Sequence, residues 1–315
     1  MNSHFPVLLT TLALVSITGC SKTQPAGAAV DGAFRTAVSP DAQTLVSVKF
    51  DKLKASDLYH RHRQELELPQ FNALSERAGL DPRRDVSNIL MVWDGKHLLL
   101  LAQGTFSSSQ LEQKLTADGA QRVPYKNFTL FAHGSEAVTF PERGLAIAAS
   151  TEVVQSELDL RSARAGSVPA ELEERLTEVP ADAQIWEVSR GGLPAANFPL
   201  RADIDSALSN ITTFVSGTSL GLRFDSGSHL QARVVCKSSE GAQRVNDALR
   251  GLIGLARLST NDNELDLLRM WDAVSIIKEE QAVRIQADLP ADLTDKLIAH
   301  LGGLRTRAGA LLDSH

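Results

Sequence analysis

The strictest constraint on the fold is an alternation of apolar and polar side chains in short stretches of the sequence. Residues 230–236 (Leu-Gln-Ala-Arg-Val-Val-Cys) place an apolar side chain at every second position, and residues 283–289 do the same. This period of two is typical of a β-strand with one buried side and one side facing water. Strands of this kind form antiparallel sheets. The pattern therefore predicts antiparallel sheet, with the Cys236 thiol on its buried side.

Turn residues between such stretches predict two hairpins. Asp225-Ser-Gly-Ser228 separates two alternating stretches, so residues 220–236 are expected to form the first of them. The second lies earlier in the chain, where Asp94-Gly95 separates Ile89–Trp93 from Leu98–Ala102. Both sides of these two strands are apolar. We therefore expect this hairpin to be covered on both sides, either within the protein or by a partner.

Apolar residues at helical spacing predict helices between the strands. Ser109 and Glu112 form a capping-box pattern at the start of a helix that should end near Gly119. Stripes of Leu, Val and Ala predict longer helices over residues 242–256 and 293–304.

The order of these elements repeats along the chain. Three pairs of segments match in the same order: 42–48 with 183–189, 94–98 with 226–230, and 127–149 with 272–289. The turn segments of the second pair are 226 − 94 = 132 residues apart. The repetition predicts an α+β protein made of two tandem related units of antiparallel sheet with helices packed on one face.

The N-terminal residues have the pattern of an export signal. Residues 5–17 form an apolar run that ends in Ile17-Thr18-Gly19-Cys20. The run is shorter than the roughly 20 apolar residues of a membrane-spanning helix, and it fits the apolar region of a signal peptide. Its ending resembles the lipobox of bacterial lipoproteins. The resemblance implies cleavage between Gly19 and Cys20 and attachment of lipid to the Cys20 thiol.

The same resemblance implies a location in the cell envelope. Several acyl chains on Cys20 would anchor the protein stably in a membrane. Ser21 stands where an Asp often retains lipoproteins at the inner membrane, which favours the outer membrane if the host has one. The mature part also loosely resembles exported bacterial proteins of unknown function. The expected organisation is signal peptide 1–19, lipidated Cys and flexible tether 20–38, first repeat 39–166, connecting helix 167–182 and second repeat 183–315.

Composition agrees with a folded, exported chain and excludes an obvious nucleic-acid partner. Hydrophobic residues make up 43% of the sequence and charged residues 22%, which suffices for a sizeable core. The net charge is −6, and Lys and Arg are scattered rather than clustered. With Cys20 lipidated, Cys236 has no partner for a disulfide within the chain.

One motif suggests catalysis, but its surroundings do not. Gly217-Thr-Ser219-Leu-Gly221 matches the G-x-S-x-G pattern of serine hydrolases, which requires a sharp turn from strand to helix. Here the following residues continue as a strand, although Asp225 or Asp272 and then His300 would complete a triad in sequence order. We expect no catalytic residue, no cofactor and no metal ligand.

The favoured hypothesis is a non-enzymatic envelope lipoprotein with a structural or protein-interaction role and an envelope protein as its partner. The alternative is a carrier or binder of lipid or another apolar ligand, held between sheet and helices. A serine hydrolase centred on Ser219 is third. Because the predicted strands bury one side and each unit supplies helices to cover it, a filled core is expected rather than a cavity.

The lipobox yields the first testable prediction. Cys20→Ala removes the thiol that accepts the acyl chains, so the variant should lose metabolic labelling by radioactive palmitate and leave the membrane fraction. A Cys236→Ala variant is the matched control and should keep the label. Labelling that persists in Cys20→Ala would contradict the lipobox interpretation.

Overall fold

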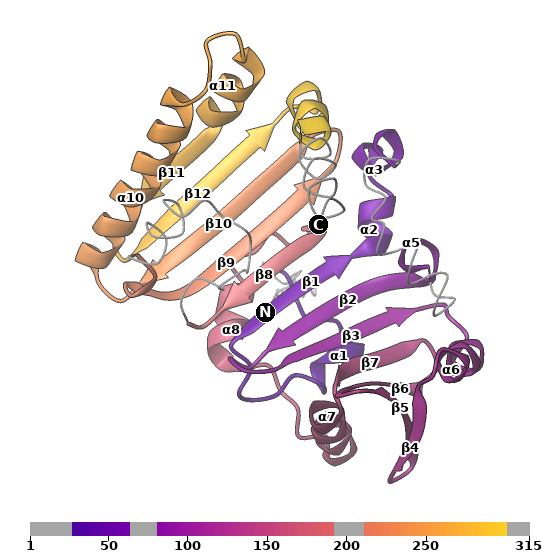
Figure 1. Ribbon diagram of the computed structural model, residues 1–315. Coiled ribbons are helices and arrows are strands. Elements are labelled where there is room, and N and C mark those ends of the chain that lie inside the picture. Colours follow the sequence, from indigo (N-terminus) through magenta and orange to yellow (C-terminus); the bar gives the residue numbers. More distant parts are fainter. Residues whose placement is uncertain (1–26, 64–80, 192–210, 301–315) are drawn as a thin grey trace, which may run out of the picture.

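The computed structural model describes residues 27–63, 81–191 and 211–300. Their strands form one antiparallel sheet of twelve strands, in the order β11-β12-β10-β9-β8-β1-β2-β3-β7-β6-β5-β4 (Figure 1). The strands are β1 (Thr44–Lys49), β2 (Val86–Trp93), β3 (Leu98–Gly104), β4 (Gln121–Tyr125), β5 (Phe128–His133), β6 (Glu136–Glu142), β7 (Leu145–Ser150), β8 (Ile185–Ser189), β9 (Val215–Phe224), β10 (Ser228–Cys236), β11 (Val274–Lys278) and β12 (Ala282–Leu289).

Helices of very different length connect these strands. The described helices are α1 (Gly32–Arg35), α2 (Phe50–Lys54), α3 (Asp57–Arg61), α5 (Pro82–Asp85), α6 (Ser108–Ala117), α7 (Thr151–Ala163), α8 (Ala170–Leu176), α10 (Ser239–Leu258) and α11 (Leu265–Asp272), and residues 291–300 are also helical. The Ser238 side chain caps α10 by accepting a hydrogen bond from the Gly241 amide. The capping box predicted at Ser109 is wrong, because Ser109 lies within α6 and the N-cap is Ser107, whose side chain makes no capping hydrogen bond.

Both predicted hairpins are confirmed. β9 pairs with β10 around the turn at Asp225, and β2 pairs with β3 around Asp94-Gly95. Gly95 has a φ of +100°, a backbone conformation that favours glycine.

The two units join into one sheet through β1 and β8, which lie side by side at its centre (Figure 1). From this junction outward, the first unit runs β1-β2-β3-β7-β6-β5-β4 and the second runs β8-β9-β10-β12-β11. Counted from the junction, the first five strands follow the same order in both units, and the first unit adds the paired strands β5 and β4 at its outer edge. This arrangement confirms the expected α+β architecture of two related units of antiparallel sheet.

The main helices of each unit cover one side of its strands, but the two units use opposite sides of the shared sheet. We call side A the side that carries Leu45 and Trp186, and side B the side that carries Val48 and Ile185. On side A, α1, α7 and α8 pack over the first unit and reach β8. On side B, α10 packs over the second unit. The shorter α2 and α6 contact the margin of the first unit on side B.

The folded body begins earlier than the sequence indicated. Residues 28–38 were expected to belong to a flexible tether, yet Val30, Phe34 and Val38 are buried in the side A core. The Ala28 amide donates to the Val179 carbonyl at 3.0 Å, and the Ser167 amide donates to Val38 at 2.9 Å. The tether prediction is therefore wrong for residues 28–38. The apolar side chains in this segment gain more by burial than a polar linker would.

Cys236 lies on the buried side of β10, as the alternation predicts. Its side chain is 2% exposed and packs in the core under α10. Burial raises the pKa of its thiol, so the neutral form is favoured.

A buried carboxyl group lies on α7, the helix that packs against the side A core of the first unit. Glu157 on α7 is buried, and its Oε1 has no hydrogen-bond partner among the described residues. Burial raises the pKa of Glu157 to about 8, and the charge of Arg161 opposes the shift only in part. The folded protein thus holds a proton at pH values where the unfolded chain has released it.

Glu157→Gln should change the pH dependence of stability. Because the folded pKa exceeds the ordinary value of 4.5, stability is fully present below that value and falls as pH rises toward about 8. Glutamine does not titrate, so the variant should lose this fall and gain about 3 kcal/mol at pH 7. Urea unfolding at pH 5 and pH 7 measures the effect. Exposed Glu152 on the same helix gives the control variant Glu152→Gln, and an unchanged pH slope in Glu157→Gln would contradict the assignment.

Candidate functional site

An apolar pocket lies on side B of the sheet, across the junction of the two units. Its volume is about 690 Å³, within the usual range of about 300–1,000 Å³ for ligand sites. Five side chains from five adjacent strands make its floor. They are the cross-strand neighbours Val48, Ile185, Leu222, Leu230 and Ala287.

The walls come from both units. α2 and α3 contribute one wall, and residues 289–298 contribute the opposite one. The lining beyond the floor consists of Phe50, Leu53, Leu58, Tyr59, Arg83, Phe224, Ser228, Leu289, Thr294, Leu297 and Ile298. Among the described residues that line the pocket, Arg83 is the one with a charged side chain.

Polar contacts tie the two walls together at the rim. The Arg61 guanidinium donates to Asp295 Oδ1 at 2.9 Å and to the Ser226 carbonyl at 2.8 Å. His62 Nε2 lies 2.7 Å from the same Asp295 oxygen. Hydrogen bonds from His62 and Arg61 outweigh burial and lower the pKa of Asp295, so its carboxylate stays charged. α3 of the first unit is thereby joined to the C-terminal helical residues of the second.

The pocket floor ends at a carboxyl group. Glu187 lies on side B, two residues beyond Ile185 on β8, and Thr218 Oγ1 donates to its Oε1 at 3.1 Å. Burial raises the pKa of Glu187 to about 7, and the hydrogen bond from Thr218 opposes this shift. The apolar floor is therefore bounded on this side by a group that titrates near neutral pH.

Ser219, the serine of the G-x-S-x-G motif, lies on the opposite side of the sheet. It is within β9, 2% exposed, and its hydroxyl donates to Glu178 Oε2 at 2.8 Å. Asp225 follows the end of β9, six residues further on (225 − 219 = 6), which is about 20 Å along an extended strand. The serine is therefore buried, its acidic neighbour is Glu178, and Asp225, which the hydrolase hypothesis named, lies far along the strand.

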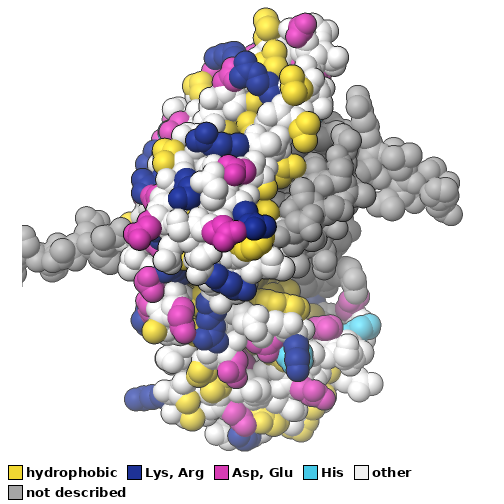
Figure 2. All heavy atoms as spheres, turned by 90° about the vertical axis from the view of Figure 1, so that its left-hand side faces the viewer, with side chains coloured by type: hydrophobic (Ala, Val, Ile, Leu, Met, Phe, Trp, Pro, Cys, Tyr) yellow, Lys and Arg dark blue, Asp and Glu magenta, His cyan; other side chains and the backbone are white. Residues whose placement is uncertain are grey.

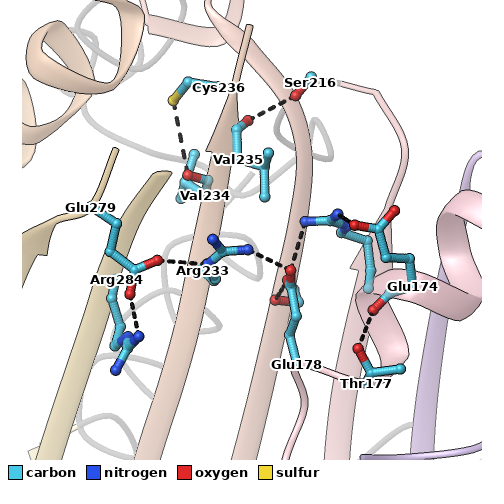
Figure 3. A network of polar contacts seen from close by, with 12 residues as sticks. Glu174, Thr177, Glu178, Ser216, Arg233, Val234, Val235, Cys236, Glu279 and Arg284 are labelled. Carbon is cyan, nitrogen blue, oxygen red and sulfur yellow. Dashed lines mark hydrogen bonds and ion pairs between the residues drawn. The ribbon is translucent and has the colours of Figure 1, made fainter. Parts of the chain in front are cut away.

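Glu178 is the centre of a polar network on side A of the second unit (Figure 3). Arg233 Nη1 donates to Glu178 Oε1 at 2.5 Å, and Arg175 Nη1 donates to the same oxygen at 2.7 Å. Arg233 Nε also donates to Glu279 at 2.9 Å, and Glu279 accepts from Arg284. The network holds the segment after α8 against β9 and β10.

The glycines of the motif have a packing role. Gly217, Ser219 and Gly221 share side A of β9, where the segment after α8 approaches the strand. A Cβ on Gly221 would lie 2.8 Å from Pro180 Cδ and 3.1 Å from Val179 Cγ1. Small residues at alternate positions therefore let this segment lie directly on the strand, and the resemblance to a nucleophile motif follows from that packing.

Gly19 and Cys20, the predicted cleavage and lipidation residues, lie outside the described residues. In the part of the chain that the structure describes, no helix is long and apolar enough to cross a bilayer. No group of three or more His, Cys, Asp or Glu side chains in that part is arranged to hold a metal ion.

Comparison with known proteins adds a likeness of fold. No family model matches the sequence, and no curated protein matches it. A crystal structure of TP0453, crystal form III, is similar with a TM-score of 0.53 and 10% sequence identity, over 87% of this chain and 99% of that chain. Crystal form I of TP0453 gives a TM-score of 0.48 at 11% identity, over 88% and 98% of the two chains. At this identity the likeness to form III shows a shared fold and nothing more.

The packing interpretation of the G-x-S-x-G motif predicts different effects at its two ends. Ser219→Ala removes one hydrogen bond and should lower the free energy of unfolding by about 1 kcal/mol. A fluorophosphonate probe should label neither this variant nor the parent protein. Gly221→Val forces Val179 and Pro180 away and should cost about 2–3 kcal/mol. Urea unfolding measures both. Covalent capture of Ser219 by the probe would restore the hydrolase hypothesis.

Proposed function

We propose that this chain binds an apolar ligand in the side B pocket while it is anchored to a membrane through Cys20. The observation that carries the proposal is the row of five aliphatic floor residues, over which the side chains of the described residues leave a cavity of about 690 Å³. A core that served stability alone would be packed to near-crystalline density.

The position of the folded body supports a function at a membrane surface. If Cys20 is lipidated, seven peptide units separate it from Gly27 (27 − 20 = 7), the first residue that the structure describes. Such a segment reaches at most about 25 Å. The pocket is then held close to the bilayer, where apolar ligands are concentrated.

A role in protein contact is the second candidate. Leu255 and Leu258 near the end of α10 are 63% and 84% exposed, and Leu265 at the start of α11 is 65% exposed. Figure 2 shows this side of the molecule, with hydrophobic side chains interspersed among charges of both signs. Exposed leucines of this kind are typical of contact surfaces when they lie together.

The proposal is tested with residues 20–315 carrying Cys20→Ala, which keeps residues 28–38 in the core. After purification from an envelope extract, native mass spectrometry should detect a stoichiometric adduct of lipid mass that is lost on denaturation. Ala287→Phe places a ring on the pocket floor and should lower occupancy about tenfold.

The matched control is Gln286→Phe, since the neighbouring residue on β12 points to side A. It should retain the adduct. Absence of any adduct in the parent protein, together with no binding of added lipids, would contradict the pocket function and leave the exposed leucines as the better candidate.

A further inference from the structure

The geometry points to a single-chain anionic amphiphile as the ligand, with its acyl chain along the floor of the side B pocket and its charged head group at Arg83. This inference rests on the proposed function, because it specifies the ligand of the same pocket. A fatty carboxylate and a lysophosphatidate share this chemistry.

The shape of the floor fits one extended acyl chain. The floor crosses five adjacent strands, from Val48 on β1 to Ala287 on β12. Four spacings between neighbouring strands add up to about 19 Å. An acyl chain in a bilayer spans roughly half of the hydrocarbon core, or about 15 Å. The floor is therefore long enough for one chain laid across the strands.

The width of the floor argues against a lipid with two chains. Only one complete cross-strand row lines the pocket. The next row on side B contains Glu187, a partly desolvated carboxyl whose charged form a second chain would bury still further. On the other side the floor is closed by α3 and by Thr294, whose hydroxyl bonds to Ser228 at 3.1 Å.

Arg83 defines the end of the pocket for a charged head group. It lies on α5, directly before β2, and β2 is the strand beyond β1 in the sheet. It is therefore at the end of the floor marked by Val48, whereas the opposite end is lined by Leu289 and Leu297. A guanidinium is the residue type best suited to bind a carboxylate or a phosphate through two parallel hydrogen bonds.

Asp81 would compete with such a ligand. Arg83 Nε donates to Asp81 Oδ1 at 2.8 Å, and Nη2 donates to Oδ2 at 3.1 Å. The Arg83–Asp81 pair has the geometry that is proposed for the ligand contact. The ligand head group would either share the guanidinium with Asp81 or take the place of the Asp81 carboxylate. Removing the Asp81 charge should then favour the ligand, while removing the Arg83 charge should disfavour it.

The test is equilibrium dialysis of residues 20–315 carrying Cys20→Ala with three radiolabelled probes: palmitate, 1-palmitoyl lysophosphatidate and neutral hexadecanol. At least one anionic probe should bind about tenfold more tightly than hexadecanol, the effect of one charge-assisted contact. The probe that shows the larger preference distinguishes carboxylate from phosphate.

Arg83→Gln should abolish that preference without weakening the binding of hexadecanol. Arg84→Gln is the matched control, because Arg84 is the adjacent arginine on α5 and lies outside the lining. Asp81→Asn should strengthen binding of the anionic probe, a gain that misfolding would not produce. Equal binding of all three probes, unchanged in Arg83→Gln, would overturn the head-group assignment and leave the pocket function standing. Binding of none of them would overturn the pocket function itself.

Discussion

The antiparallel pairing of β1 with β8 is the interaction on which the remaining structure depends. Five residue pairs join the two strands, and the backbone contacts continue beyond them, since Lys49 donates to the Gln184 carbonyl and Arg190 donates to the Gln43 carbonyl. Trp186 and Leu45 on side A bury this junction beneath α8. Without it, each unit would expose a sheet edge with unpaired backbone groups. With it, two small sheets become one surface that is wide enough to carry a pocket across its middle.

The main helices cover side A of the sheet in the first unit and side B in the second. This change of side explains why the pocket is at the junction of the two units. Side A of β9 carries small residues, and α8 with the following segment packs directly on them. The apolar residues of the same strand, such as Leu222, therefore point to side B. α10 covers that side further out in the second unit, and α2 reaches it from the first. Between these helices the strands are apolar and uncovered by either, so the cavity arises from a change of packing side.

Sequence patterns predicted the local structure and the repetition well, because both depend on near neighbours in the chain. The hairpins, the long α10 and the buried position of Cys236 follow from alternation and turn residues. The side of the sheet that each hairpin buries cannot be predicted from these patterns. Leu45 on β1 pairs with Val92, and its counterpart Trp186 on β8 pairs with Gly221. Val92 and Gly221 are therefore equivalent positions in the two units, and they are 221 − 92 = 129 residues apart. The turn segments are instead 132 residues apart in the sequence. A slip of three residues reverses the side of every side chain. The sequence left a pocket between sheet and helices as an alternative but could not locate it, because the floor takes one residue from each of five strands.

A pocket built from both units has a thermodynamic consequence that a pocket within one unit would lack. Val48 belongs to the first unit and Leu230 to the second, and the Arg61–Asp295 pair joins the walls above them. A ligand on this floor contacts both halves only while β1 and β8 remain paired. Its binding free energy therefore adds to the free energy that holds the units together, and the gain rises with the logarithm of its concentration over its dissociation constant. A ligand in this cavity would supply packing that the side chains of the described residues do not.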